Sequence, residues 1–325
     1  MFDDFFEEPL PTLDRQAAFK LLDSVIAKRS TLPCIMAVKV TGDAGYLTFE
    51  GTDLDIGAKV RAPNFLDFRG VAVVDWKAFK AQANLVPVDK MDAFDPTDFP
   101  TLPDVEGQDI GTQWLADGRK CLYAVSKNKT RLSLNGVYIH EDGCVATDGH
   151  RLHLVPGSYG CQAIVPPKVF TATKGVPDKC LVTEAKIALV YPWGHVVSKV
   201  LEGQYPNYQQ IVPREAHKYP TCTVDTKTLL DACVRACALR KEVPSVLFSG
   251  GTLSIQGIAG DWIAIAPVKA PEGFEVRFNA KYMQDTLKGL GPVTTIHCAH
   301  PLKAVLFNVK DSEETRILMP IRLYA

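Results

Sequence analysis

Apolar residues at helical spacing define three long segments of the chain. In the first, Phe19, Leu22 and Ile26 recur at intervals of three and four residues, so their side chains fall on one face of a helix. The other two segments carry a central apolar stripe of the same kind. The pattern therefore predicts helices over residues 16–29, 112–129 and 225–242.

A shorter helical pattern comes about 55 residues after each long one. These patterns predict helices over residues 75–86, 166–174 and 279–290, with Asn279 as an N-cap. Between the helices lie alternating or β-branched runs with turn signals, such as SVLFSGGTLSIQG (245–257), which predict strands. Each repeat thus predicts helix, strands, helix, strands, and the repeat occurs three times.

Two segments rich in Pro and aromatic residues separate the repeats, DFPTLPD (98–104) and QYPNYQQIVP (204–213). Pro stiffens such segments and ends strands, so both are boundary candidates. We therefore predict an α+β protein of three consecutive related domains, each with two helices packed on antiparallel sheets. The predicted boundaries are a tail at 1–14 and domains at 15–100, 101–212 and 213–325.

The formal net charge of −1 hides an uneven distribution. The six predicted helices hold 17 Lys or Arg against 7 Asp or Glu, whereas the rest of the chain holds 19 against 30. Lys and Arg are good helix formers, but so is Glu, which is nearly absent from these helices. Basic helices suit a polyanion held through its phosphates, so the pattern favours sequence-independent binding of nucleic acid.

The composition is that of an ordinary soluble globular protein, with 46% hydrophobic and 22% charged residues. No apolar run reaches the ~18–20 residues that span a bilayer. The acidic start, MFDDFFEEPL, lacks the basic residues of a signal peptide. These features predict a cytoplasmic protein with no membrane partner.

The nine cysteines are scattered without any CxxC pair, which argues against a zinc site. Cys233 and Cys237 lie one helical turn apart and are best interpreted as small buried apolar residues. His150 and His153 offer only two ligands, at a spacing that suits a helix, in a segment that predicts a strand. We therefore expect no metal and no other cofactor.

The segment CVATDGHRLHLV (144–155) places Asp148, His150 and Arg151 within four positions between two apolar runs. These residues could form an acid–base set, a turn shaped by Asp148 and Gly149, or the polar lip of a site for another protein. Catalysis has the least support. No Ser or Cys nucleophile lies in a recognisable elbow, and no second carboxylate or metal set accompanies Asp148.

Six motifs, in order along residues 15–323, resemble those of the bacterial sliding clamp family, the beta subunit of DNA polymerase III. They are RSTLPCI (29–35), LTFEGTDLDI (47–56), TRLSLNGVYIHEDGCVATDGHRLHLV (130–155), VLEGQYPNYQQIVP (200–213), RFNAKYMQDTLKGL (277–290) and LMPIRL (318–323). The resemblance implies the DNA-clamp fold and head-to-tail pairing of two three-domain chains into a ring. It also implies a non-catalytic processivity factor that encircles duplex DNA and tethers DNA polymerase and the clamp loader.

In this family the third motif forms part of a hydrophobic cleft between the second and third domains, where partner proteins insert a short peptide rich in Gln, Leu and Phe. The resemblance places these residues at the cleft: Leu134, Thr147, Gly149, His150, Arg151, Leu152, Pro206, Gln210, Ile211, Met319, Pro320, Ile321 and Arg322. Apolar walls would contribute about 25 cal/mol per Å² of buried surface. His150 and Arg151 would point into the cleft and hydrogen-bond the peptide, while Asp148 would turn the chain.

The resemblance also implies DNA contacts in the loop after the first helix and in the segment before LNG. The matching basic residues are Arg29, Lys127, Lys129 and Arg131. The family often has aromatic residues directly before LNG, where this chain has Leu132 and Ser133. Contact with DNA would therefore be mainly ionic, and a solvated loop of lysines is the simpler alternative.

The chain departs from the family in its first domain. Roughly thirty residues separate the second helix from the closing Pro motif in the second and third domains, but residues 87–98 leave only about twelve. We expect the first domain to lack its last two or three strands, which in the family form the subunit interface. Ring closure would then use other surfaces. Phe2, Phe5 and Phe6 could dock there, unless the tail is a disordered acidic segment.

Two smaller departures concern the cleft and the C-terminus. Gln210 stands where the family commonly has arginine, and Tyr324 and Ala325 extend past the usual terminal leucine. Both favour a partner peptide somewhat different from that of a standard clamp. The shortened first domain points to a phage or mobile element in a bacterial host. It also leaves an alternative function, a clamp-like protein that captures clamp-binding peptides without encircling DNA.

Overall fold

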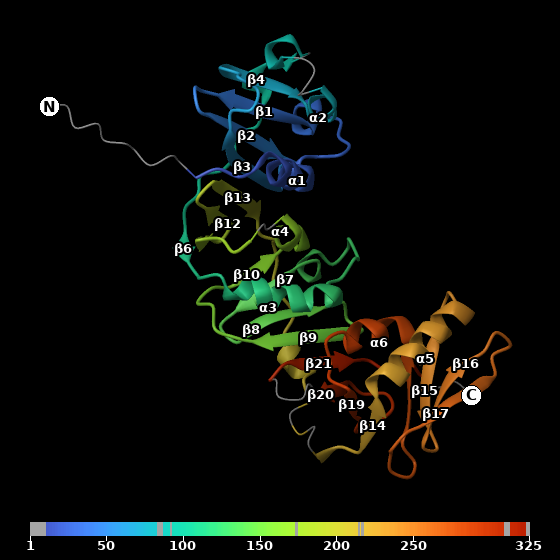
Figure 1. Ribbon diagram of the computed structural model, residues 1–325. Helices are drawn as coiled ribbons and strands as arrows, with labels where there is room; N and C mark the ends of the chain where they lie inside the picture. The colour runs from blue at the N-terminus through green and yellow to red at the C-terminus, as the bar shows by residue number, and fades with distance from the viewer. Residues whose placement is uncertain are drawn as a thin grey trace. The chain divides into compact units, whose positions relative to one another are not determined.

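The computed structural model describes residues 11–82, 87–91, 93–172, 175–213, 215, 218–308 and 313–322. Phe2, Phe5, Phe6, Tyr324 and Ala325 lie outside the described residues. The chain divides into two compact units, which are drawn in Figure 1. Unit 1 comprises residues 1–116 and 159–201, and unit 2 comprises residues 117–158 and 202–325. The division into three domains stays a prediction.

Unit 1 is built on an antiparallel sheet of nine strands in the order β5-β4-β1-β2-β3-β13-β12-β11-β6. Its strands are β1 (Ala37–Gly42), β2 (Tyr46–Thr52), β3 (Ile56–Pro63), β4 (Gly70–Asp75), β5 (Ala93–Phe94), β6 (Gln108–Asp109), β11 (Lys179–Val182), β12 (Lys186–Tyr191) and β13 (Gly194–Lys199), with β10 (Ala163–Val165) also in this unit. Its helices are α1 (Arg15–Val25), α2 (Trp76–Gln82), α4 (Pro167–Ala172) and the first half of α3 (Gln113–Cys121).

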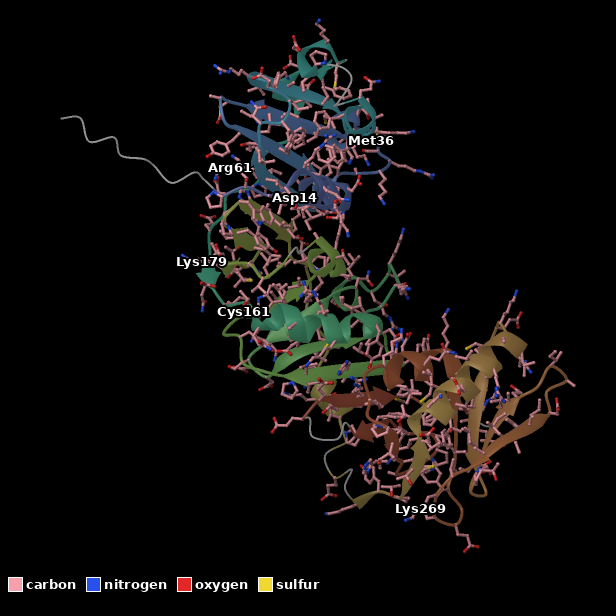
Figure 2. The ribbon with its side chains drawn as sticks, viewed as in Figure 1. Asp14, Met36, Arg61, Cys161, Lys179 and Lys269 are labelled. Atoms are coloured by element: carbon pink, nitrogen blue, oxygen red, sulfur yellow. The ribbon has the colours of Figure 1, made fainter. Side chains whose placement is uncertain are left out.

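The first helix begins where its sequence provides a cap. The Asp14 carboxylate accepts a hydrogen bond from the Ala17 N–H at 3.0 Å, which satisfies a donor that the first helical turn leaves unpaired. Just before it, the Leu13 N–H donates to the Arg61 carbonyl at 2.8 Å, so this segment runs beside β3 (Figure 2). Phe19 then packs against the fully buried Phe49 of β2, with ring centroids 6.1 Å apart.

The contact between β3 and β13 makes the sheet of unit 1 continuous. Val60 pairs with Gly194 in the antiparallel register, and Ile56 pairs with Ser198 at the other end. Gly194 has φ +147°, and a β-carbon there would collide with the Lys59 carbonyl oxygen. Glycine at this position therefore permits the close approach of the two strands.

The three repeats differ in the number of strands after their second helix. Three strands come after α4, and three strands, β19, β20 and β21, come after α6. Between α2 and Phe99, the described residues contain only one strand, the two-residue β5. This difference agrees with the short spacing that the sequence shows in the first repeat.

Unit 2 contains two antiparallel sheets. One has neighbouring strands in the order β7-β8-β9-β21-β20-β19-β14, and the other has the order β17-β16-β15-β18. The strands are β7 (Val137–His140), β8 (Gly143–Thr147), β9 (Arg151–Pro156), β14 (Thr221–Asp225), β15 (Ser245–Ser249), β16 (Thr252–Gln256), β17 (Trp262–Pro267), β18 (Glu275–Asn279), β19 (Val293–His297), β20 (Val305–Asn308) and β21 (Thr315–Leu318).

Two helices of unit 2, α5 (Thr226–Leu239) and α6 (Ala280–Leu287), lie side by side over the second sheet (Figure 1). Their inner faces join a core with Phe248, Phe278 and Phe307, all fully buried. Cys233 is fully buried in this core and Cys237 packs against it, as the apolar interpretation predicts. All nine cysteines are free thiols.

All six predicted helices exist, and the four whose predicted ranges are fully described, α1, α3, α5 and α6, are shorter than their patterns. The helix predicted for 112–129 ends at Cys121, a 3₁₀ turn covers Leu122–Ala124, and Lys127 and Lys129 lie in a loop. Within their observed bounds the six helices hold ten Lys or Arg and four Asp or Glu. The helices therefore still carry more Lys and Arg than Asp and Glu. Some of the basic residues predicted for the helices, such as Lys127 and Lys129, lie in the loops that follow them.

Candidate functional site

The predicted cleft residues of unit 2 gather where β9 pairs with β21. Arg151 lies opposite Leu318, and Leu152 lies opposite Ile317. The Met319 N–H donates to the His150 carbonyl at 2.7 Å, which joins the motif 318–323 to the segment 144–155. Leu152 is 1% exposed, so its side chain is part of the core and does not line the site.

The turn between β8 and β9 is shaped by two side chains. One oxygen of Asp148 accepts the N–H groups of His150 and Arg151, at 2.9 and 3.1 Å. The Thr147 hydroxyl donates to the Arg151 carbonyl at 2.7 Å and accepts the Gly149 N–H at 3.1 Å. Gly149 has φ +88°, which favours glycine. The prediction that Asp148 and Gly149 form a turn is confirmed.

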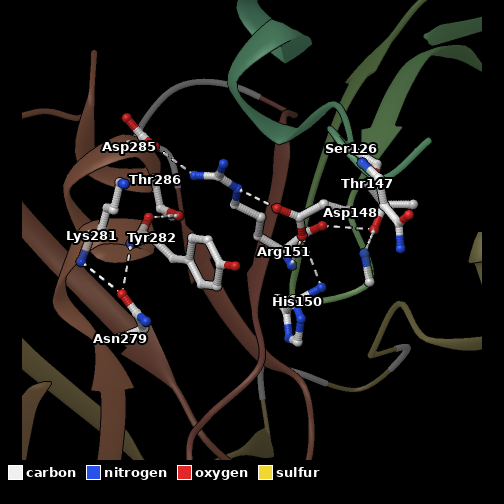
Figure 3. Close-up of polar contacts among 12 residues, drawn as sticks. Ser126, Thr147, Asp148, His150, Arg151, Asn279, Lys281, Tyr282, Asp285 and Thr286 are labelled. Atoms are coloured by element: carbon white, nitrogen blue, oxygen red, sulfur yellow. Dashed lines mark hydrogen bonds and ion pairs between the residues drawn. The ribbon is translucent and has the colours of Figure 1, made fainter. Parts of the chain in front are cut away.

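Arg151 does not occupy the position we expected. Its guanidinium binds the second oxygen of Asp148 at 3.0 Å and a carboxylate oxygen of Asp285, on α6, at 2.6 Å (Figure 3). It also lies 4.7 Å from the ring centroid of Tyr282 and 5.4 Å from that of Tyr123. The expected hydrogen bond from Arg151 to a partner peptide stays a prediction. The residue is 9% exposed, and its charge is paired within the chain.

Asp285 is the second anchor of this network. Burial alone would raise the pKa of Asp285, but hydrogen bonds from Lys288 and Arg151 outweigh burial and hold the pKa below its usual value. The carboxylate is therefore ionised over the whole physiological range. Asp285 lies 134 positions from Arg151, so no local pattern predicts their contact.

His150 remains at the surface beside this network. Its ring stacks on that of Tyr282, with centroids 5.5 Å apart and an interplanar angle of 19° (Figure 3). The side chain is exposed and can contact a ligand. Sequence reasoning missed Tyr282, although it lies in the motif 277–290, because nothing in that motif distinguishes a half-buried tyrosine at the surface from a core one.

The segment 205–211 is fixed against the β7–β8 hairpin. The Tyr208 hydroxyl lies 3.0 Å from His140 Nε2, and Gln209 donates to Asp142 at 2.9 Å. His140 Nδ1 accepts the Asp142 N–H at 3.1 Å, so the ring is neutral with its proton on Nε2. Burial lowers the pKa of His140, which favours the same neutral form.

An open apolar pocket lies next to this segment. Its volume is about 670 Å³, and it is lined by Gln210, Ile211, Val212, Pro213, Tyr219, Ala299, Leu302, Lys303, Ala304 and Met319. Ile211 and Leu302 are 45% and 51% exposed, which is unusual for large apolar side chains. Lys303 contributes a positive charge and no carboxylate belongs to the lining. The pocket can therefore bury an apolar side chain of a ligand that is neutral or negatively charged.

The pocket includes only part of the predicted set. Gln210, Ile211 and Met319 line it. Of the other members, Leu134, Thr147 and Leu152 are buried, Pro206 and Arg322 are exposed, and Pro320 and Ile321 are half-buried. Leu302, Ala304 and Lys303 were missed, because the turn between β19 and β20 that supplies them carries no motif of its own.

The predicted DNA contacts are exposed. Arg29 belongs to unit 1, and Lys127, Lys129 and Arg131 belong to one loop of unit 2. Among the described residues, none of the four forms an ion pair with a carboxylate. The loop is ordered by its own side chains, since the Asn128 carboxamide oxygen accepts the Thr130 N–H at 3.0 Å. The cations can therefore contact phosphate directly.

The histidine pair of the segment 144–155 does not form a metal site. His153 is fully buried, with its ring nitrogens 3.1 Å from the Lys120 carbonyl and 3.2 Å from Glu314. Within the described ranges, no three His, Cys, Asp or Glu side chains are grouped as metal ligands. No described helix is long and apolar enough to cross a membrane.

Comparison with known proteins finds near full-length relatives, although no protein-family model matches the chain. The beta sliding clamp of Caulobacter vibrioides is 25% identical over 371 residues, which covers 96% of this chain and 99% of the relative. The beta sliding clamp of Synechococcus elongatus is 26% identical over 94% of this chain and 96% of the relative. The aligned length exceeds the 325 residues of this chain, so part of each relative has no counterpart here.

Solved structures share the fold. The DnaN sliding clamp of Bartonella birtlesii, solved with bound griselimycin, superimposes with a TM-score of 0.81 at 22% identity, over 96% of this chain and 99% of that one. The sliding clamp of Caulobacter crescentus gives a TM-score of 0.82 at 23% identity, over 95% and 98%. With the motif order and the paired β9–β21 site, these matches show that the chain is similar to bacterial beta sliding clamps over nearly its whole length and shares their fold.

Proposed function

We propose that this protein is a DNA sliding clamp, a non-catalytic processivity factor that encircles duplex DNA and tethers DNA polymerase. The observation that carries the proposal is the match to beta sliding clamps over nearly the whole chain, including the segment with the open pocket. Catalysis by Asp148 and His150 is not proposed. Both oxygens of Asp148 are already hydrogen-bonded, one to backbone N–H groups and the other to Arg151.

We propose that partner proteins bind through a short peptide rich in Gln, Leu and Phe. The open pocket supports this, because Ile211, Leu302 and Met319 offer apolar surface that the chain itself leaves uncovered. The exposed His150 and Gln210 supply hydrogen-bonding groups at its border. Polymerase and clamp loader are the expected partners, as in the family.

Sequence-independent contact with DNA is supported by the charge of the helices and by the exposed loop cations. Phosphate contacts alone hold a duplex without reading bases, and they exchange readily along it. Arg29, Lys127, Lys129 and Arg131 are the proposed direct contacts. No aromatic side chain precedes LNG, so the contact is ionic.

A homo-oligomer is expected from the proposed function, and we propose a head-to-tail dimer of three-domain chains. The edge strand β17 offers Trp262 and Ile263, which are 38% and 42% exposed. Such an edge is suited to strand pairing with a second copy. The two-residue β5 in the first repeat favours the alternative, in which a monomer captures clamp-binding peptides without encircling DNA.

One experiment separates the two functions. The protein is loaded onto circular DNA, and its retention is measured before and after the circle is linearised, together with its mass in solution. A sliding clamp is an oligomer that stays on circles and leaves cut DNA by its ends. A peptide-capturing protein stays monomeric, binds the peptide and is not retained on circles.

A further inference from the structure

A second cavity of unit 2 lies where the C-terminal ends of α3 and α6 meet the start of β21. Its volume is about 550 Å³, and it is lined by Arg119, Lys120, Leu122, Tyr123, Lys288, Gly289, Glu314 and Arg316. None of these residues belongs to the predicted peptide cleft or to the predicted DNA contacts. Four of the eight are cations and one is a carboxylate, so the lining favours an anion.

The single carboxylate, Glu314, is fully engaged by the protein. It accepts hydrogen bonds from Lys120 at 3.0 Å and Arg316 at 3.2 Å, and it lies 3.2 Å from His153 Nε2. The hydrogen bond with His153, followed by those with Lys120 and Arg316, holds the pKa of Glu314 well below its usual value despite burial. Glu314 therefore orders the wall of the cavity and offers no free oxygen for a metal ion.

Arg316 carries an unused donor at this cavity. The side chain is 5% exposed, and one terminal nitrogen donates to the carbonyls of Thr286 and Lys288, at 2.8 and 2.5 Å. Its Nε–H has no partner among the described residues. The buried guanidinium therefore adds positive charge to the wall of the cavity.

Two cations at the rim, Arg119 and Lys288, have exposed side chains that can reach a ligand. Arg119 is exposed and forms no ion pair with any described carboxylate. The side chain of Lys288 is 69% exposed, and its partner Asp285 also binds Arg151, so Asp285 stays compensated when Lys288 moves. Leu122 and Tyr123 supply an apolar wall between these cations.

We propose that this cavity binds a phosphate group of the DNA backbone, with Arg119 and Lys288 as the direct contacts. A phosphate oxygen accepts from the rim cations, the buried guanidinium of Arg316 adds positive charge behind them, and the apolar wall lies against the adjoining sugar. Arg119 and Lys120 belong to α3, one of the helices whose charge supports DNA binding. The inference rests on the proposed function and adds a particular phosphate site to it.

The test compares the double variant Arg119→Gln/Lys288→Gln with the control Lys179→Gln. Lys179 is an exposed lysine of β11, at the margin of the sheet of unit 1 (Figure 2). Affinity for a short duplex is measured by fluorescence anisotropy over a series of salt concentrations. We expect the double variant to bind about tenfold more weakly at low salt, with the slope of log affinity against log salt smaller by about two. The control should match the wild type.

A second arm uses inorganic phosphate alone, at constant ionic strength. We expect phosphate to raise the melting temperature of the wild type and of Lys179→Gln, but not that of the double variant. If phosphate stabilises only the proteins with an intact cavity while duplex affinity is equal in all three, the assignment to DNA is overturned. If the double variant behaves as the wild type in both arms, the cavity is not a phosphate site.

A different result would contradict the proposed function. It is a wild-type protein that binds no duplex and is not retained on circular DNA. In that case the phosphate arm still decides whether the cavity binds phosphate.

Discussion

Two regions of unit 2 that the sequence assigns to one cleft differ in the groups that fill them. Around Arg151, the chain fills the space itself: Asp148 and Asp285 neutralise the guanidinium, and Tyr282 and Tyr123 lie against it. Around Ile211, the chain leaves an open pocket, in which Ile211 and Leu302 are about half exposed. The charge of the first region is therefore paired within the chain, whereas the second region leaves apolar surface exposed.

The difference has a physical cause. A buried charge without partners is strongly unfavourable, so a chain that places an arginine under its surface must also supply carboxylates. Exposed apolar surface costs much less and is tolerated in the free protein. The apolar region is thus the one that we propose for the partner, and Arg151 holds the loop that carries His150 through its ion pairs with Asp148 and Asp285.

The largest effect should come from removing Arg151. Arg151→Ala leaves Asp148 without its cation and Asp285 with Lys288 alone, so we expect a loss of about 3 kcal/mol in the free energy of unfolding. Urea denaturation measures it. Arg322→Ala, an exposed arginine of the same predicted cleft, should change the free energy of unfolding by less than about 0.5 kcal/mol. Equal effects of the two substitutions would remove the distinction between the regions.

Truncation in the open pocket should affect binding and spare the fold. We expect Leu302→Ala and Ile211→Ala each to weaken a labelled Gln/Leu/Phe-rich peptide about tenfold, or about 1.4 kcal/mol, with little change in the urea midpoint. Fluorescence anisotropy gives the affinity. Leu132→Ala removes a leucine that is 60% exposed and outside the pocket, so it serves as the control. Unchanged peptide affinity in both pocket variants would show that the pocket is not the binding site.

The wall of the pocket should lose stability in mild acid. Burial lowers the pKa of His140 in the folded state, whereas the unfolded chain titrates near the reference value of about 6.5. As the pH falls below about 6.5, the unfolded state takes up the proton first, so stability decreases until the folded ring is also protonated. Urea midpoints over a pH series measure the slope.

The control for the acid sensitivity is His140→Gln, which cannot titrate. Burial lowers the pKa of His153 and His195 in the same direction, so part of the wild-type slope should persist in the variant. Only the difference between the two slopes reports on His140. Identical slopes would mean that His140 does not contribute to the acid sensitivity.

The smallest effects are expected in the loop 126–133. Lys127→Ala and Lys129→Ala should each weaken duplex binding only a few-fold and lower the salt slope by about one, because each removes one phosphate contact. Anisotropy with a short duplex measures both quantities. Peptide affinity should not change, since neither lysine lines the pocket. An unchanged salt slope would support the solvated-loop alternative.

Much of the fold was predictable because its signals are local. Apolar spacing located all six helices. Asp14 and Asn279 cap α1 and α6 by accepting hydrogen bonds from backbone N–H groups two or three residues later in the chain. Helix ends were predicted less well. The chain leaves α3 at Cys121 because the Ser126 N–H pairs with the Leu134 carbonyl, a contact that the helical pattern does not contain. The short segment after α2 was predictable from spacing alone.

The site was predictable only in part. The turn at Asp148 is formed by local hydrogen bonds, so the sequence predicts it. Asp285 for Arg151, His153 for Glu314 and Leu302 for Ile211 come from positions far along the chain, and no local pattern specifies them. For this reason the sequence assigned Arg151 to a ligand and missed Leu302, Tyr282 and the cavity beside Arg316.

By itself, the sequence determined the order of helices and strands, the threefold repeat, the excess of positive charge on the helices and the family resemblance, because periodicity and composition are properties of neighbouring residues. Only the tertiary structure decided which cations are free and which are neutralised. That choice depends on carboxylates such as Asp285 and Glu314, which strand pairing between β9 and β21 and the packing of α6 bring within hydrogen-bonding distance.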